Sequence, residues 1–213
     1  MNKLTLRLNT ILGELAKCNT FADVGCDHGY VAEAMLSEGK CDFVYVTDVS
    51  GVCLKKAEDL LKNNYDGKFK AIVTDGLKNV PKVEQVLIAG MGGELICDIL
   101  KNADFLPERL VLQPMKNTEK VRKTVISLGY KMVKDTTFKD VKYYDLIVCE
   151  KGEESYSEYE IEFGRDNLRD KGDAFKEVIL KKLAVIDVAT KTASEEERKR
   201  LENLKKKYEE VIS

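Results

Sequence analysis

The sequence predicts an α/β protein built on a mostly parallel sheet. Short apolar runs alternate with segments of helical periodicity, which is the pattern of strands joined by crossover helices. The expected strands lie near 20–24, 42–48, 70–74, 84–89, 109–113, 131–138 and 143–149, and the expected helices near 30–38, 51–64, 92–101 and 118–129. Only residues 139–142 separate the last two strands, a connection that permits a hairpin and is too short for a crossover helix. The last strand is therefore expected to run antiparallel.

A seven-stranded sheet with an antiparallel last strand is typical of the Rossmann-like class I methyltransferases and not of the dinucleotide-binding folds. A short amphipathic helix is expected before the first strand, because a set of leucines and one isoleucine recurs on one face. Its members are Leu4, Leu8, Ile11, Leu12 and Leu15. We therefore expect a methyltransferase-like sheet domain over residues 1–155.

After Glu150 the sequence changes character. Residues 151–160 are polar and charged, which is typical of a linker. Apolar side chains then recur at helical spacing in 175–186 and again in 201–212, and Ser194 with Glu197 has the spacing of a capping box between them. This pattern predicts a C-terminal, coiled-coil-like helical hairpin over residues 156–213, for which a purely stabilising role is the alternative.

Composition excludes several classes of protein. The chain has 213 residues, 34% of them charged, and a formal net charge of −2, so no overall basic field indicates nucleic acid, although a local patch could still bind it. No apolar run approaches the roughly 20 residues that span a bilayer, and the chain opens on an amphipathic pattern around Arg7 rather than a signal peptide. The six cysteines form no C-x-x-C pair. We expect a cytoplasmic protein with no membrane partner, no disulfide framework and no metal.

The turn after the first strand carries the clearest chemical signal. The run from Asp23 to Gly29 ends an apolar strand, turns through Gly25 and opens a helix, which brings backbone N–H groups up to a ligand. Asp48 ends the next strand, where an acid commonly binds ribose hydroxyls. A dinucleotide fingerprint does not fit, because Asp27 stands at its second glycine and would repel a pyrophosphate. A carboxylate there suits the ammonium of S-adenosylmethionine (SAM); the alternative is an ordinary strand–helix turn.

Two further strand ends fit a binding crevice. Asp75 and Gly76 follow the third strand, where an acid can accept a hydrogen bond from the adenine amino group, although Asp-Gly turns are common in any protein. The run Ala89-Gly90-Met91-Gly92-Gly93 ends the fourth strand. Glycines at such a position are typical of backbone that passes close to a ligand.

The fifth strand ends on residues suited to a base. Pro114 cannot extend the ladder, so Gln113 and Asn117 are expected at the rim of the crevice, where their amides could pair with a base edge. Lys116 and the cations that follow it form either a basic patch beside the site or a solvated helix face; they are Lys120, Arg122 and Lys123. Tyr143 could stack on a base or pack in the core.

These motifs resemble those of the TrmK family, the bacterial tRNA (adenine-22-N1)-methyltransferases. The matching phrases are Leu6-Arg7-Leu8, Ala22 to Tyr30, Ile88 to Gly93, Leu112-Gln113-Pro114 and Tyr143 to Glu150. Asp48 is a departure, since comparable relatives usually carry Glu there. The resemblance implies a SAM domain, a helical C-terminal domain, and methyl transfer to N1 of adenosine 22 in tRNA.

The motifs and the resemblance together give a set of candidate residues. Candidates for binding SAM are Arg7, Asp23, Gly25, Cys26, Asp27, His28, Asp48, Val49, Asp75, Gly76, Ala89, Gly90, Met91 and Gly92. Catalytic candidates are Asp27, Gly90 and Gln113, with Asp27 or the Gly90 carbonyl steadying the charge on the methylated ring. Substrate-binding candidates are Gln113, Pro114, Lys116, Asn117 and Tyr143.

tRNA is the expected partner, bound by a monomer, with cations of the helical hairpin clamping the RNA body. Those cations are Lys181, Lys182, Arg198, Arg200, Lys205 and Lys206. The alternatives are a SAM-dependent enzyme acting on another RNA base, a small molecule or a protein, and a binding protein that has lost turnover. A nicotinamide oxidoreductase is excluded by the glycine spacing.

Overall fold

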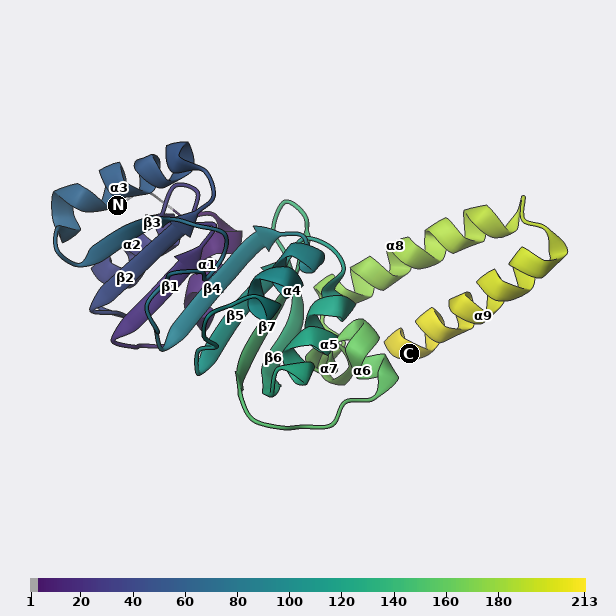
Figure 1. The fold of residues 1–213 in the computed structure, drawn as a ribbon. Coiled ribbons are helices and arrows are strands. Elements are labelled where there is room, and N and C mark those ends of the chain that lie inside the picture. The colour runs from purple at the N-terminus through teal and green to yellow at the C-terminus, as the bar shows by residue number, and fades with distance from the viewer. Residues whose placement is uncertain (1–3) are drawn as a thin grey trace.

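The computed structural model describes residues 4–213, and its centre is one seven-stranded sheet with the order β3-β2-β1-β4-β5-β7-β6 (Figure 1). The strands are β1 (Thr20–Val24), β2 (Phe43–Asp48), β3 (Phe69–Val73), β4 (Gln85–Met91), β5 (Arg109–Pro114), β6 (Tyr130–Lys139) and β7 (Tyr143–Lys151). Strands β1 to β5 pair in parallel, whereas β7 is antiparallel to both β5 and β6. The predicted class I methyltransferase topology is confirmed.

Helices cover both faces of the sheet because each carries one apolar stripe. The helices that precede or cross between the strands are α1 (Leu6–Glu14), α2 (Tyr30–Ser37), α3 (Gly51–Tyr65), α4 (Gly93–Lys101) and α5 (Thr118–Ser127). Side chains of α1, α2 and α3 share one buried cluster with one face of the sheet, and those of α4 and α5 share the second cluster with the other face. The layers place the carboxyl ends of all parallel strands at one edge, where ligands bind in open α/β sheets.

Two short helices were not predicted from the sequence. Helices α6 (Glu158–Phe163) and α7 (Arg165–Asp170) follow β7 within or just after the stretch expected to be a linker. Ser157 and Glu160 form both halves of a capping box at the start of α6. Helix α7 packs on β6, an edge strand whose Asp135 and Thr137 N–H groups donate to side chains of Asp166 and Asn167, each at 2.8 Å. Helix α7 therefore covers part of an otherwise open sheet edge, and α6 packs beside it.

A buried ion pair fastens these helices to the sheet domain. Arg122 of α5 and Asp135 of β6 are each 1% exposed and form two hydrogen bonds of 2.8 and 2.9 Å. The same guanidinium donates to the carbonyls of Ile161 and Glu162 in α6. Gly164 lies against the pair, where a Cβ would come within 2.9 Å of both side chains. The link between sheet and C-terminal region is thus packed and hydrogen-bonded.

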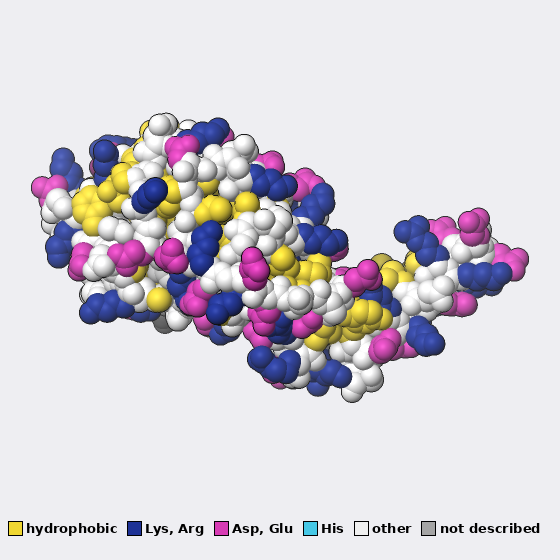
Figure 2. Space-filling model, turned by 60° about the horizontal axis from the view of Figure 1, so that its bottom comes forward, with side chains coloured by type: hydrophobic (Ala, Val, Ile, Leu, Met, Phe, Trp, Pro, Cys, Tyr) yellow, Lys and Arg dark blue, Asp and Glu magenta, His cyan; other side chains and the backbone are white. Residues whose placement is uncertain are grey.

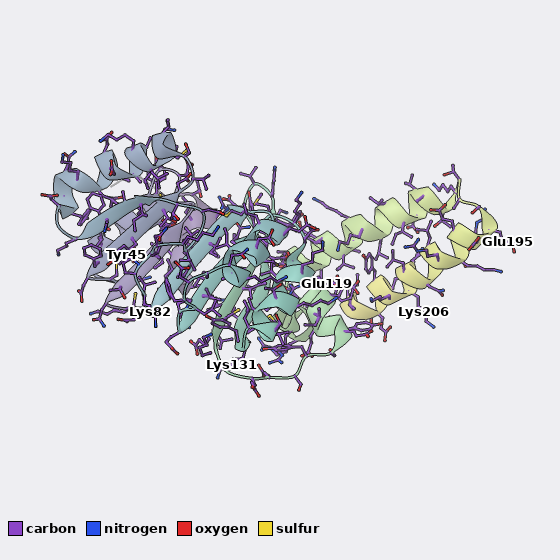
Figure 3. The ribbon with its side chains drawn as sticks, in the orientation of Figure 1. Tyr45, Lys82, Glu119, Lys131, Glu195 and Lys206 are labelled. Carbon is purple, nitrogen blue, oxygen red and sulfur yellow. The ribbon has the colours of Figure 1, made fainter. Side chains whose placement is uncertain are left out.

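The predicted helical hairpin is present as α8 (Asp173–Thr190) and α9 (Glu195–Ile212), which extend side by side away from the sheet (Figure 1). At its base Phe175, Ile179 and Val211 pack around Phe163 of α6. Ser194 caps α9 by accepting from the N–H of Glu197. Lys206 and Glu195 lie along α9, far from the sheet (Figure 3), and acidic and basic side chains alternate over the tip of the hairpin (Figure 2).

Within residues 4–213, no helix has the length and apolar character that crossing a membrane would require.

Candidate functional site

A cavity of about 350 Å³ opens at the carboxyl ends of β1, β2 and β4, beside α1. Ten of the fourteen candidates for binding SAM line it: Arg7, Asp23, Gly25, Cys26, Asp27, His28, Asp48, Ala89, Gly90 and Met91. The remaining wall is made by Leu8, Tyr30, Val31 and Leu87. Strand ends far apart in the sequence thus bring most of the predicted residues together.

Three carboxylates define the electrostatics of this first cavity. Asp23 is buried at the end of β1, Asp27 is exposed in the following turn, and Asp48 is half-buried at the end of β2. Asp27 pairs with His28 at 2.9 Å between Oδ2 and Nδ1, and Asp48 accepts from the Ser50 N–H at 2.8 Å. The cavity therefore favours a ligand that carries positive charge.

Asp23 has an unusual protonation equilibrium. Burial, opposed by a hydrogen bond from the backbone of Ala32 and reinforced by the charge of Asp48, raises the pKa of Asp23 to about 7. At neutral pH this carboxyl is poised between its two forms, so a cation placed in the cavity would favour the ionised one. Burial likewise raises the pKa of the Cys26 thiol, helped by the neighbouring aspartates. Cys26 is thus a small, inert wall residue.

Gly25 is required by close approach as well as by backbone conformation. Its φ is +69°, and a Cβ at this position would lie 2.0 Å from Cε of Met91. Met91, at the end of β4, therefore passes directly over the turn after β1. The turn after β1 and the end of β4 thus lie in contact at Gly25 and Met91.

Gly90 sits on a β-bulge at the end of β4. The pairing with β5 shifts between Ala89, opposite Gln113, and Met91, opposite Pro114, so that Gly90 has no ladder partner in β5. Its φ is +80°, and a Cβ there would come within 2.9 Å of Nη2 of Arg7. The bulge leaves the peptide of Gly90 at the cavity wall, beneath the Arg7 guanidinium.

Arg7 crosses from α1 to three other elements. Its backbone N–H donates to the side chain of Asp140 in the β6–β7 turn at 3.0 Å. In its side chain, Nε donates to Oε1 of Gln113 at 2.8 Å, and Cζ of the guanidinium lies 5.5 Å from the Tyr144 ring centroid. It is the only Arg or Lys among the described residues that line the first cavity. Its position beside Gly90 adds one fixed positive charge to a cavity otherwise rich in carboxylates.

Gln113 is not at the exposed rim where it was expected. It is fully buried, with Oε1 bound to Arg7 and Nε2 donating to the Pro114 carbonyl at 2.9 Å. Pro114 cannot donate to the ladder, but the strand continues to it, so Gln113 still faces the interior. The structure makes Gln113 the support of Arg7 rather than a group open to a base.

A second cavity, of about 440 Å³, lies between the end of β5, the β6–β7 hairpin and the helices α6, α8 and α9. Four of the five substrate-binding candidates line it: Pro114, Lys116, Asn117 and Tyr143. The two cavities are neighbours, because Met91 of the first and Met115 of the second are joined by a backbone hydrogen bond of 2.8 Å. Gly93 donates to the Lys116 carbonyl beside this bond.

Four of the cofactor candidates lie outside the first cavity. Val49 is exposed, and Asp75 is exposed and paired with Lys78 at 3.3 Å. Gly76 is buried and accepts from the Thr47 hydroxyl, while Gly92 is the N-cap of α4. The acids around the cavity are thus Asp23, Asp27 and Asp48, and Asp75 is not one of them.

The predicted basic patch after β5 is largely neutralised. Arg122 is buried against Asp135, Lys120 pairs with Glu94, and Lys123 pairs with Glu119. Of the four cations, Lys116 alone has no carboxylate partner among residues 4–213.

The sequence reading missed the contribution of the C-terminal helices to the second cavity. Glu162, Val178, Lys182 and Tyr208 complete its wall. Their helical spacing marked the apolar stripes of the hairpin, but nothing local in the sequence shows that one end of those stripes closes against β5 and β7. Tyr143 makes this contact visible, since its hydroxyl donates to Glu177 of α8 and its ring lies 4.4 Å from Nζ of Lys181.

Comparisons with known proteins identify the family of this chain. The profile of the family described as "Methyltransferase domain" matches residues 4–147. The tRNA (adenine(22)-N(1))-methyltransferase of Bacillus subtilis is 30% identical over 158 residues, which are 71% of this chain and 66% of that protein. Protein MG248 of Mycoplasma genitalium is 28% identical over 61% of each chain. The chain thus spans less than two thirds of the length of these curated relatives.

Solved structures extend the likeness to the whole fold. Streptococcus pneumoniae Sp1610 has a TM-score of 0.93 at 23% identity, over 99% of this chain and 100% of that one. TrmK of M. capricolum, solved with S-adenosyl-homocysteine, has a TM-score of 0.88 at 23% identity, over 98% and 97%. The resemblance to TrmK proteins is therefore confirmed in fold over nearly the full length, and the chain belongs to the methyltransferase-domain family.

Proposed function

We propose that this protein is a SAM-dependent methyltransferase that methylates N1 of adenosine 22 in tRNA, acting as a monomer in the cytoplasm. The observation that carries the proposal is the pairing of two adjoining cavities, one rich in carboxylates and one that collects the predicted substrate residues. The 30% identity to the B. subtilis enzyme supports the choice of tRNA and of this adenosine.

The residues of the first cavity fit SAM charge for charge. SAM supplies a methyl group on a positively charged sulfur, together with an ammonium and a carboxylate. Asp23 and Asp27 suit the two positive charges, and Arg7 suits the carboxylate, since a guanidinium binds carboxylates through paired N–H donors. Asp48 at the end of β2 is placed to accept from ribose hydroxyls. Asp75 and Gly76 would then contact the adenine beyond the cavity proper.

The chemistry asks little of the protein in proton transfer. Adenine N1 carries an in-plane lone pair at neutral pH, so it can form the new N–C bond directly while the electron pair of the broken C–S bond stays on sulfur. Positioning of the two reactants supplies most of the rate. The methylated ring becomes positively charged, and the Gly90 carbonyl, freed from the ladder by the bulge, and Asp27 are the groups that would steady it.

The target base has to leave the RNA stack to reach the methyl group, as in other enzymes that act on bases. The proposed path of the RNA runs over the second cavity, which adjoins the first and is lined by Lys116 and Tyr143 among others. Cations of α8 and α9 would hold the body of the tRNA.

The experiment is methylation of unmodified tRNA transcripts with radiolabelled SAM, followed by nucleoside analysis. Label in 1-methyladenosine, lost when position 22 of the transcript is changed to G, is the expected result. Label in another nucleoside would support the alternative of a different RNA base. Label in protein or small molecules, or none despite SAM binding, would overturn the proposal.

A further inference from the structure

The second cavity has the chemistry of a nucleotide site. We propose that it binds a nucleotide of the RNA next to the target adenosine, with its phosphate between Lys116 and Lys182 and its base against the aromatic wall. The assignment rests on the proposed function, because it takes the neighbouring cavity to hold SAM.

Two of the three acids in the cavity wall are paired with lysines, whereas its two lysines are unpaired within residues 4–213. Glu119 is paired with Lys123 and Glu162 with Lys207, so neither carboxylate is free to oppose an anion. Lys116 and Lys182 have no carboxylate partner within residues 4–213 and approach the cavity from opposite sides, one from the end of β5 and one from α8. Two free ammonium groups across one opening suit a phosphate.

The rest of the wall suits a flat ring. Tyr143 and Tyr208 contribute half-buried aromatic rings and Val178 an aliphatic surface. Nζ of Lys182 lies 5.4 Å from the Tyr208 ring centroid, so the ammonium and the ring are close enough for one nucleotide to touch both. Bases stack on such rings with little regard to sequence.

Asp145 gives the cavity a hydrogen-bond acceptor. Its two oxygens accept from the hydroxyls of Thr118 and Thr137, both at 2.7 Å, and it has no cationic partner within residues 4–213. Each oxygen retains a lone pair that can accept from the amino group of a base. A phosphate site at the two lysines and an acceptor at Asp145 match the two ends of a nucleotide.

The position of the cavity indicates that this nucleotide belongs to RNA. The backbone hydrogen bond between Met91 and Met115 makes the two cavities neighbours, so an RNA strand whose target base reaches the methyl group at the mouth of the first passes the second. The helical hairpin is therefore part of the substrate site and not a remote appendage. A free nucleotide has the same chemistry, and the experiment must separate the two sources.

The test compares a double variant of the cavity, Lys116→Gln with Lys182→Gln, with a matched control, Lys17→Gln with Lys62→Gln. The control lysines are exposed, lie outside both cavities and the helical hairpin, and have no carboxylate partner within residues 4–213. We expect the Michaelis constant for tRNA to rise about tenfold in the cavity variant. The slope of log affinity against log salt should fall in magnitude by about one, because both lysines contact the same phosphate. The turnover number, the dissociation constant for S-adenosyl-homocysteine and the melting temperature should stay unchanged. Equal effects in the two double variants, or none in either, would overturn the assignment.

Two further arms complete the design. Adenosine 5′-monophosphate titrated into enzyme saturated with S-adenosyl-homocysteine should bind only in the millimolar range, and micromolar binding abolished by the cavity variant would assign the site to a free nucleotide instead. Fluorescence anisotropy of labelled tRNA reads the site without catalysis. If the wild type binds tRNA without methylating it, the proposed function fails. The nucleotide site is then still supported if the cavity variant alone loses affinity for tRNA. It is rejected if the cavity variant binds tRNA as tightly as the wild type.

Discussion

Arg7 and Gln113 form a hydrogen bond of 2.8 Å between Nε and Oε1, although 106 residues separate them in the chain. Gln113 is fully buried, and its bond to Nε holds the guanidinium in one orientation beside Gly90. A preorganised cation at this point of the cavity suits the carboxylate of SAM.

Replacing Arg7 should therefore weaken cofactor binding. We expect Arg7→Met to raise the dissociation constant for S-adenosyl-homocysteine about 10- to 100-fold, the range for loss of a charged hydrogen bond. Arg7→Lys, which keeps the charge and loses the fork, should fall between. Calorimetry is the measurement, and Lys17→Met, at an exposed site outside the cavity, is the control. Unchanged affinity in Arg7→Met would show that Arg7 has a structural role alone.

Gly90→Ala should lower methylation activity by more than its loss of stability accounts for. The new Cβ would lie 2.9 Å from Nη2 of Arg7, so the guanidinium must move. The backbone φ of +80° is also strained for alanine, so the bulge must change its conformation or carry that strain. Gly129→Ala is a matched control, with φ +78° and no neighbouring atom within 4 Å of its Cβ. Both variants should lose about 1–3 kcal/mol of stability through strain. Only Gly90→Ala should lose more than about tenfold in the turnover number, and equal losses of activity would contradict the site assignment.

Cofactor affinity should depend on pH through Asp23. The pKa of Asp23 is about 7 in the unliganded protein, and the ammonium of a bound cofactor would lower it, so binding releases a proton below that pH. Affinity for S-adenosyl-homocysteine should therefore rise by up to about tenfold per unit between pH 5 and 7 and then level off. Calorimetry across this range should find the dependence much reduced in Asp23→Asn; a dependence of the same size in the variant would assign it to another group.

The same shift affects stability with the opposite sign. The folded-state pKa of Asp23 lies above its unfolded value, so the native protein binds this proton more tightly. Without ligand, the contribution of Asp23 to stability is present below about pH 4 and is lost as pH rises toward 7. As pH rises over that interval, the free energy of unfolding of Asp23→Asn should therefore increase relative to that of the wild type. Denaturant titrations at several pH values would measure this difference.

The Arg122–Asp135 pair should dominate the stability of the junction between the sheet and the C-terminal helices. Arg122→Met leaves a buried carboxylate without its partner and should cost about 3–5 kcal/mol. The double change Arg122→Met with Asp135→Leu should recover much of that loss. Lys55→Met, which breaks exposed pairs with Glu58 and Asp59 in α3, should cost far less stability than Arg122→Met. Urea titrations measure the free energy of unfolding of all three variants. A loss of less than about 1 kcal/mol in Arg122→Met would contradict this prediction and indicate that water reaches the pair.

The sequence predicts the site where chemistry depends on local pattern and fails where it depends on a distant partner. Local sequence is enough to mark the turn at Gly25, the acid at Asp48 and the glycine at Gly90, because each depends on the residue type needed at a strand end. The burial of Gln113 is not, since it is decided by Arg7 on another element. Arg122 looks like one more cation on a solvated helix until Asp135 is placed opposite it.

The short helices and the second cavity were missed for related reasons. Helix α6 has only six residues, too few for a periodic stripe, although its capping pair Ser157 and Glu160 is present in the sequence. The closure of α8 over Tyr143 depends on the geometry of a protruding hairpin rather than on any local motif. The pairing of Asp75 with Lys78, outside the first cavity, is a further feature that its residue type and strand-end position did not predict.

The most direct measurement is calorimetric titration of the purified protein with SAM and with S-adenosyl-homocysteine. A cavity with carboxylates at 23, 27 and 48 and a fixed guanidinium at 7 should bind one equivalent of either compound, with affinity lost in Asp48→Ala and Arg7→Met. The absence of binding by folded wild-type protein, or binding that both variants retain, would contradict the account.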